Sequence, residues 1–389
     1  MIGRRAFTLG LASLLGGCAT HHQSGPATGL PSTSKGYRPP PDSDEAGLWL
    51  AVDKVEQAQK RSPSRIRDQA ANALVQDIIC RLAGDRCPEL RPYLVRVPEF
   101  NATCSPNGMV SVWSGLLLRC KDESQLAGVL GHEIAHYLRR HSLQRMRDKR
   151  EWDDMMAFMQ FTLQGPLAKT MWDISGDVRM ASISMFSRDH ERESDEMGLV
   201  MMADAGYDPF ACAETWRQLI DEDKAGDVKH DFNFFLSTHP ATKERIETLQ
   251  QLAEQRGRPK TSPPNRLDQA IRHLRRGFME DEINQGRFKR TEKLLSRLAA
   301  DGNDPAGALY YRGELYRRRN KDGDEASALG FYHESCEAAD PPAEAFRGVG
   351  LIRWRRGEAE LAREYFRRYL DRAPQAGDSD MIRKYLSGA

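Results

Sequence analysis

Helical periodicity dominates the chain, and only two short segments alternate as β-strands do. Apolar residues recur at helical spacing from residue 48 to residue 82, with an interruption at Pro63. Residues 93–97 and 109–113 predict strands, and a turn signal at residues 105–108 separates them. The pattern indicates an α+β, mostly α fold with a small antiparallel sheet.

Two longer helices are predicted after the strands. The first runs from Glu123 to about Trp152, and the second runs from residue 187 to residue 204 and ends at the C-cap signal Ala205-Gly206. Between them, residues 152–183 are rich in Met and Phe and are interrupted by Gly and Pro. This segment fits a flexible flap over a cleft, a partner-binding surface or ordinary core.

The character of the chain changes after a polar break at residues 257–264. Paired helical segments follow, and the clearest unit has tetratricopeptide spacing at Phe346, Gly350, Gly357, Ala362, Phe366 and Pro374. In such repeats small residues let neighbouring helices approach, and aromatic residues fill the groove between them. Arg353 stands where an aromatic is usual, so a generic helical bundle is the alternative. We expect a globular domain at residues 46–258 and an α-helical, tetratricopeptide-like repeat domain at residues 264–389.

Composition is that of a soluble globular protein, with 40% hydrophobic and 29% charged residues in a chain of 389. This length predicts about two domains plus tails. The formal net charge is +1, and the arginine clusters alternate with acidic residues on helical segments, so we expect no nucleic acid partner. No segment after the N-terminus reaches the length of a transmembrane helix.

The first residues have the features of an export signal. Arg4 and Arg5 precede an apolar stretch at residues 7–15, which is far shorter than the roughly 20 residues needed to span a membrane. The arginine pair resembles a twin-arginine signal, and Leu15-Gly16-Gly17-Cys18 resembles a bacterial lipobox. Residues 1–18 are then a signal peptide that ends at a lipidated Cys18, or an ordinary cleaved signal with a chance cysteine.

The lipobox interpretation predicts a periplasmic protein that is attached to the membrane through its N-terminal lipid. Ala19 after the cysteine favours sorting to the outer membrane of a Gram-negative cell. Residues 19–45 are rich in Ser, Thr, Gly and Pro and cannot bury enough apolar surface to order themselves. We therefore predict a disordered tether over these residues.

Export also permits disulfide bonds. Cys80 and Cys87 are close enough to join a helix end to the next loop, and Cys104 and Cys120 could join the two ends of a strand-containing hairpin. Sequence does not fix connectivity, so buried free thiols are the alternative for both pairs.

The motif that carries chemistry is Gly131-His132-Glu133-Ile134-Ala135-His136, within the first long helix. Residues four apart lie on one helix face, so the imidazoles of His132 and His136 can reach a single metal ion. Glu133 follows His132 by about 100° of helix rotation, which places its carboxylate where it can deprotonate a water molecule on that ion. The motif is short enough to arise by chance, so it needs a third ligand nearby.

Carboxylates on the second helix can supply that ligand. A catalytic zinc takes three protein ligands and keeps one position open. Glu191 can be the third ligand, while Asp195, one turn later, can hydrogen-bond a ligating imidazole and fix its tautomer. Glu193 is expected to point away into solvent, and His190 is a weaker candidate for a ligand.

These residues, together with Gly198 and the run Ser237-Thr238-His239-Pro240, resemble the HtpX/BepA-type gluzincin zinc metallopeptidases, which belong with the prenyl-processing proteases. The resemblance covers about residues 48–256. It implies one Zn²⁺ per chain, with the roles already given for His132, His136, Glu191, Glu133 and Asp195. Ser194 stands where the family usually has Ala, and little effect is expected because that side chain need not touch the ion.

The resemblance also implies a role for His239. This histidine can occupy the open metal position and keep the enzyme latent, or donate a hydrogen bond to the oxyanion of the transition state. A structural histidine near the cleft is the third alternative.

Two classes of function follow. The first is a zinc endopeptidase of the bacterial envelope that acts on unfolded or misassembled envelope proteins, with the substrate strand added to an edge strand near residues 109–113. The second is a chaperone or assembly factor whose zinc site is latched and whose repeats bind partners such as the outer-membrane assembly machinery. A nonproteolytic hydrolase that uses the same zinc chemistry is a weaker alternative.

Overall fold

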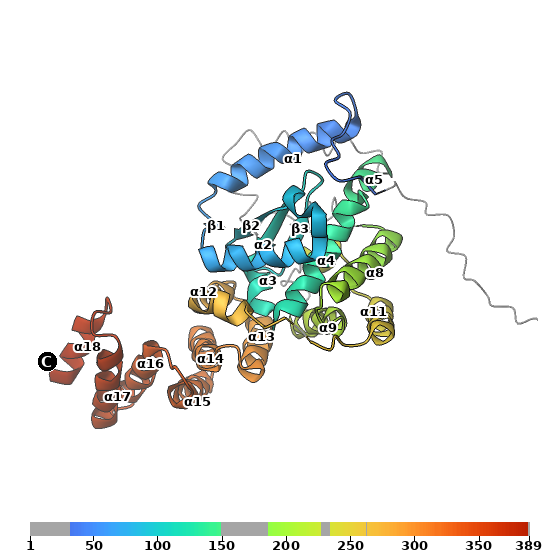
Figure 1. Ribbon diagram of the computed structural model, residues 1–389. Helices are drawn as coiled ribbons and strands as arrows, with labels where there is room; N and C mark the ends of the chain where they lie inside the picture. The colour runs from blue at the N-terminus through green and yellow to red at the C-terminus, as the bar shows by residue number, and fades with distance from the viewer. Residues whose placement is uncertain (1–31, 149–185, 227–233, 262, 388–389) are drawn as a thin grey trace, which may run out of the picture.

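The computed structural model describes residues 32–148, 186–226, 234–261 and 263–387 (Figure 1). These residues form a globular part around a small sheet, and a helical arm leads from it to the C-terminus. The predicted signal peptide with Cys18 and the Met-rich segment at residues 152–183 lie outside the described residues. No helix among the described residues is long and apolar enough to cross a lipid bilayer.

The globular part begins with helices that flank the sheet and ends with helices that surround its long central helix. Its first elements are α1 (Asp44–Arg61), β1 (Arg65–Ile66), α2 (Gln69–Ala83), the 3-10 helix η1 (Gly84–Glu89), β2 (Arg91–Val95), β3 (Ala102–Cys104), β4 (Met109–Trp113) and α3 (Ser114–Arg119). The later elements are α4 (Glu123–Leu138), α5 (His141–Asp148), α8 (Arg188–Asp204), α9 (Phe210–Ala225), α10 (Phe234–Thr238) and α11 (Lys243–Arg256).

The sheet has the strand order β1-β2-β4-β3 and is mixed rather than antiparallel. β2 and β4 are parallel, with Tyr93 opposite Ser111, and β3 pairs antiparallel with β4, with Thr103 opposite Ser111. The predicted antiparallel sheet is therefore wrong, because the turn at residues 105–108 joins β4 to the short strand β3 and not to β2. The predicted edge strand at Met109–Trp113 is also wrong, since β4 is paired on both sides and β3 is the edge.

Helix α4 is the centre of the globular part and is buried along most of its length. It ends at Leu138, so the prediction of one helix from Glu123 to Trp152 is wrong. Arg140 adopts a left-handed backbone with φ of +57°, and its guanidinium pairs with Glu45 at the start of α1. No glycine or proline marks this break in the sequence. What accompanies the break is a long-range ion pair, which a local sequence pattern does not reveal.

The backbones of α4 and α8 cross in direct contact. A Cβ atom on Gly198 would lie 2.7 Å from the backbone nitrogen of His132, and one on Gly131 would lie 2.9 Å from the carbonyl oxygen of Gly198. Real Cβ atoms do not approach other atoms this closely, so both helices need glycine at the crossing. The crossing sets α8 beside the His132–His136 segment.

One of the two predicted disulfides is present. Cys80 is bonded to Cys87 and joins the end of α2 to η1. The pairing of Cys104 with Cys120 is wrong, because both are free thiols, and burial raises the pKa of each. Both lie in the apolar core, so this pair follows the alternative expectation of buried free thiols.

The segment before α1 contacts the globular part. The backbone N–H of Gly36 donates to Glu89 at 2.7 Å, and Arg86 donates to the carbonyl oxygen of Thr33 at 2.7 Å. Tyr37 donates to Glu45 at 2.7 Å. The prediction of disorder up to residue 45 is therefore wrong for residues 33–45.

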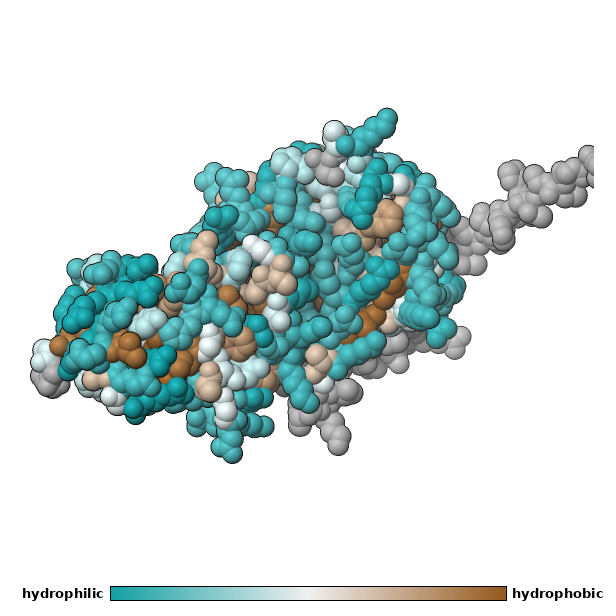
Figure 2. Space-filling view, turned by 90° about the horizontal axis from the view of Figure 1, so that it is seen from below, coloured by the Kyte–Doolittle hydropathy of each residue, from teal (hydrophilic) through white to brown (hydrophobic). Residues whose placement is uncertain are grey.

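The C-terminal arm is a row of antiparallel helices. They are α12 (Leu267–Ile283), α13 (Phe288–Asp301), α14 (Pro305–Arg319), α15 (Asp324–Glu337), α16 (Ala343–Arg355), α17 (Ala359–Arg372) and α18 (Ser379–Ser387). Within the pair α16 and α17, a Cβ atom on Gly350 would lie 2.5 Å from the ring of Phe366, so the small residue makes room for the aromatic one. The face seen in Figure 2 is mostly hydrophilic, with smaller hydrophobic patches along the arm and on the globular part.

A buried ion-pair network joins the arm to the globular part. Arg119, at the end of α3, donates to Glu222 of α9 at 2.7 Å and to Glu282 of α12 at 2.9 Å. Arg297 of α13 also pairs with Glu222, at 3.0 Å. The side chains of Arg119, Glu222 and Glu282 are each at most 2% exposed, so no solvent replaces a lost partner.

Replacing Arg119 by Leu should lower the free energy of unfolding by about 3–5 kcal/mol, because two buried carboxylates lose their shared partner. Urea denaturation of the purified protein measures this change. The matched control is Arg383→Ala, which removes an ion pair between exposed side chains and should change stability by less than about 0.5 kcal/mol. Equal effects of the two substitutions would contradict a stabilising role of the network.

Replacing Gly198 by Ala should destabilise the protein by about 1–3 kcal/mol, because the added methyl group forces α8 away from α4. Thermal unfolding measures the change. Gly330→Ala is the control, since no atom lies within 4 Å of its Cβ position and a helical Gly→Ala change there gains about 0.5–1 kcal/mol. A Gly198→Ala protein as stable as the wild type would refute the close crossing.

Candidate metal centre

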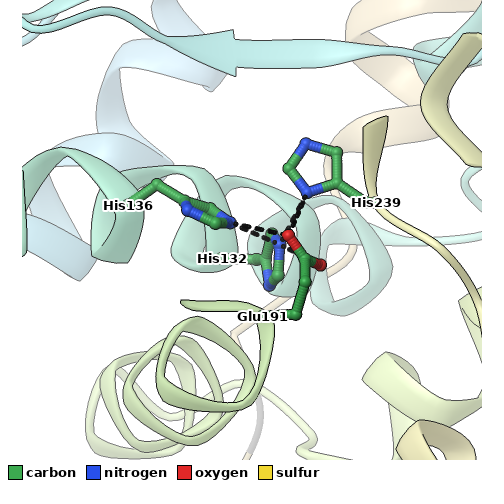
Figure 3. A group of neighbouring side chains, drawn as sticks. All are labelled: His132, His136, Glu191 and His239. Atoms are coloured by element: carbon green, nitrogen blue, oxygen red, sulfur yellow. Dashed lines mark hydrogen bonds and ion pairs between the residues drawn. The ribbon is translucent and has the colours of Figure 1, made fainter. Parts of the chain in front are cut away.

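Four buried side chains from three parts of the fold converge on one point (Figure 3). His132 and His136 project from one face of α4, Glu191 comes from the first turns of α8, and His239 directly follows α10. One ligand atom from each lies within 4.8 Å of the others. Among the described residues, this is the group with the composition and spacing of a metal site.

The distances between these atoms suit the ligands of a single ion. His136 Nε2 lies 3.0 Å from His132 Nε2 and 3.4 Å from Glu191 Oε1. His239 Nδ1 lies 2.9 Å from Glu191 Oε1 and 3.2 Å from His132 Nε2. Tetrahedral zinc with bonds of about 2.0–2.1 Å places its ligand atoms about 3.3–3.4 Å apart. The donor set of imidazoles and one carboxylate is also one that zinc prefers.

The protonation of His132 supports a cation at this point. Its Nδ1 lies 3.0 Å from Asp195 Oδ1, and a carboxylate at that distance favours the proton on Nδ1. When His132 is neutral with its proton on Nδ1, its Nε2 carries an unshared electron pair directed at the other ligand atoms. Burial lowers the pKa of His132, but the contacts with Asp195 and Glu191 outweigh it and raise the pKa to about 9. The pocket therefore favours positive charge beside this imidazole, which a metal ion would supply.

Arg245 of α11 holds the two carboxylates of α8 in place. It binds Asp195 through two hydrogen bonds of 2.7 Å and pairs with Glu191 Oε2 at 2.7 Å. Its guanidinium also stacks over Trp216, 4.3 Å from the ring centroid. Arg245 could not be predicted from the sequence, because one basic residue on a polar helix carries no signal until the fold brings it to the site.

Glu133 lies on the side of the cluster that faces the edge strand β3. Burial raises the pKa of its carboxylate, although the charges of His239 and His132 and the nearby backbone of Cys104 in β3 partly oppose this. Glu133 Oε1 is buried without a hydrogen bond from any described residue and lies 3.4 Å from His239 Nε2. This oxygen is therefore available to a water molecule or a substrate group.

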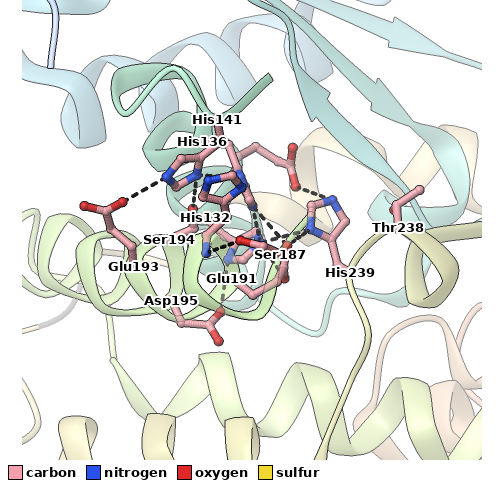
Figure 4. A network of polar contacts seen from close by, with 12 residues as sticks. His132, His136, His141, Ser187, Glu191, Glu193, Ser194, Asp195, Thr238 and His239 are labelled. Carbon is pink, nitrogen blue, oxygen red and sulfur yellow. Dashed lines mark hydrogen bonds and ion pairs between the residues drawn. The ribbon is translucent and has the colours of Figure 1, made fainter. Parts of the chain in front are cut away.

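A second layer of polar residues lies behind His136 (Figure 4). His141, which the sequence analysis missed, contacts His136, and Glu193 contacts His141 at 2.9 Å and Arg139 at 2.6 Å. Glu193 points away from the ligand group and 37% of its side chain is exposed, as predicted, but it also pairs with buried His141. His190 stacks on His141 and is no member of the ligand group.

Comparisons with known proteins agree with this geometry. The family model of peptidase family M48 matches residues 67–253, which include all four residues of the cluster and Glu133. Mitochondrial metalloendopeptidase OMA1 of Schizosaccharomyces pombe is 34% identical over 164 residues, which are 41% of this chain and 45% of that protein. OMA1 of Arabidopsis thaliana is 32% identical over 206 residues, which are 52% of this chain and 38% of that protein.

A bacterial relative matches a longer part of the chain. The beta-barrel assembly-enhancing protease of Escherichia coli (strain K12) is 27% identical over 243 residues, which are 60% of this chain and 48% of that protein. The chain thus spans less than half the length of these relatives. The expected zinc metallopeptidase is supported, since residues 67–253 match the model of peptidase family M48 and these relatives are named metalloendopeptidases or proteases.

Proposed function

We propose that the protein is a zinc-dependent endopeptidase that cleaves unfolded or misassembled proteins of the bacterial cell envelope. The observation that carries the proposal is the buried group of His132, His136 and Glu191, with the carboxylate of Glu133 beside it. In this arrangement two imidazoles and one carboxylate would hold the ion. When bound there, zinc supplies Lewis acidity to the scissile carbonyl and to the attacking water.

Glu133 acts as the general base and then as the general acid. It takes a proton from the attacking water and passes it to the leaving amine. Burial raises the pKa of its carboxylate, which brings proton affinity closer to what both transfers need. Asp195 and Arg245 take no part in proton transfer, but they keep His132 and Glu191 in position.

The substrate binds as an added strand along β3. In the described sheet β3 pairs with β4 on one side only, so its other edge is free to bind an extended peptide. The backbone of Cys104 is close enough to Glu133 to lower its pKa, which places this edge beside the general base. A peptide paired with β3 would therefore present a carbonyl group to the site.

The helical arm selects or presents substrates as a tetratricopeptide-like repeat domain at residues 264–389. The packing of Gly350 against Phe366 supports the repeat assignment, since this is the small-to-aromatic contact that the spacing predicts. The fixed junction at Arg119 supports coupling between arm and active site, because it holds α12 against α3 and α9.

The location we propose is the periplasmic face of the outer membrane, with residues 1–18 as the export signal and Cys18 as the lipidated residue. The Arg4-Arg5 pair and the Leu15–Cys18 run support this. The bacterial relatives named beta-barrel assembly-enhancing proteases suggest outer-membrane proteins as substrates. The partners of this protein would then be stalled envelope proteins and the machinery that assembles them.

A second candidate function is a chaperone or assembly factor whose zinc site is latched. The position of His239 favours it, because its Nδ1 lies with the ligand atoms and fills the position that a catalytic zinc keeps open. In the latched form the repeats bind partners, and peptide cleavage requires His239 to leave.

Replacing Glu133 by Gln should lower kcat/KM for an unfolded protein substrate by at least about 100-fold, since the base is lost while the ligands stay. Digestion of reduced, carboxymethylated casein, with bound zinc measured on the same samples, tests this. One zinc per chain in both proteins is the control for an intact site. A variant that cleaves as fast as the wild type would refute the role of Glu133.

Replacing His239 by Ala should raise proteolysis at least about tenfold, if fewer than about one molecule in ten is open in the wild type. The control is His273→Ala, which replaces an exposed histidine of α12 that pairs with Asp68 and should leave the rate of proteolysis unchanged. A loss of about 100-fold or more would instead assign His239 to the oxyanion. Unchanged activity together with lower stability would make it a structural residue.

A further inference from the structure

Of the two histidines of α4, His136 is the one whose Nδ1 atom faces another histidine. His136 Nδ1 lies 2.9 Å from His141 Nδ1, and His141 Nε2 lies 2.9 Å from Glu193 Oε2. The His141 side chain is fully buried, whereas Glu193 is partly exposed and is also paired with Arg139. A continuous chain of contacts thus leads from the surface carboxylate to the candidate metal ligand (Figure 4).

The donors and acceptors along this chain can be assigned from one end. The Glu193 carboxylate only accepts hydrogen bonds, so His141 must donate from Nε2. A neutral imidazole with its proton on Nε2 has an unshared pair on Nδ1, and there it accepts the proton of His136 Nδ1. His136 is then left with an unshared pair on Nε2, which is the atom that lies among the ligand atoms.

We propose that His141 is a positioning residue that fixes the tautomer and orientation of His136 for zinc, with Glu193 as its anchor. The proposal rests on the proposed function, because it requires His136 to be a ligand. His141 supports His136 as Asp195 supports His132, but with an imidazole in place of a carboxylate. Ring orientation by such partners raises metal affinity.

The surroundings of His141 hold its ring in one plane. His190 stacks on it, with ring centroids 4.2 Å apart and an interplanar angle of 18°. The hydroxyl of Ser194 lies 3.2 Å from the same Nδ1, so the two donors would share its single unshared pair. Ser194 therefore acts on the site through His141 and not by touching the ligand group, and alanine at this position would remove that contact.

The test compares two replacements of His141 in the full-length protein, with the zinc dissociation constant measured by competition with a chelator. His141→Leu keeps the volume and removes the acceptor, and we expect the dissociation constant to rise about 10- to 100-fold. His141→Asn places an amide oxygen where Nδ1 lies, and we expect it to stay within about threefold of the wild type. The control is Glu196→Ala, which removes an exposed carboxylate of α8 and should have no effect.

The outcomes separate a positioning role from a structural one. If His141→Asn loses as much zinc affinity as His141→Leu, or if His141→Leu binds zinc as tightly as the wild type, the proposal is overturned. Should His141→Leu not fold, Glu193→Ala decides, because it removes only the partly exposed anchor and must still weaken zinc binding. A wild-type protein that binds no zinc would refute the proposed function itself, which is a different result from equal binding by wild type and variant.

Discussion

The contact between the backbones of α4 and α8 is the constraint on which the rest of the site depends. Because Gly131 and Gly198 have no side chains, the two helices touch where they cross, and α8 then runs past the histidine face of α4. Glu191 and Asp195 lie about two turns and one turn before Gly198, so the crossing delivers one carboxylate to the ligand group and the other to the back of His132. A wider crossing would leave both carboxylates short of the imidazoles.

Burial makes this arrangement demanding as well as useful. Charged groups away from water must be paired, and the two carboxylates of α8 and the second nitrogen of His136 have such partners. Arg245 neutralises Asp195 and contacts Glu191, while the His141–Glu193 pair supports His136 from the other side. The paired groups are fixed in place before any substrate arrives, which is how enzymes lower the cost of reorganisation during a reaction.

What the sequence predicted well is local. Helical spacing was enough to place His132, Glu133 and His136 on one helix and Glu191 and Asp195 on another, and the structure brings the two sets together. What it did not predict depends on contacts between distant segments: the parallel pairing of β2 with β4, the helix break at Arg140 opposite Glu45, and the arrival of Arg245 at Asp195. His141 was missed for a related reason, since its role exists only because that break turns the chain back toward His136.

The most direct test of the account is a crystal structure of the zinc-loaded protein with anomalous diffraction recorded on both sides of the zinc absorption edge. We expect one anomalous peak per chain, about 2.0–2.2 Å from His132 Nε2, His136 Nε2 and a carboxylate oxygen of Glu191. No peak at this point, or a zinc ion bound only by other residues, would contradict the central claim that these side chains form the metal centre.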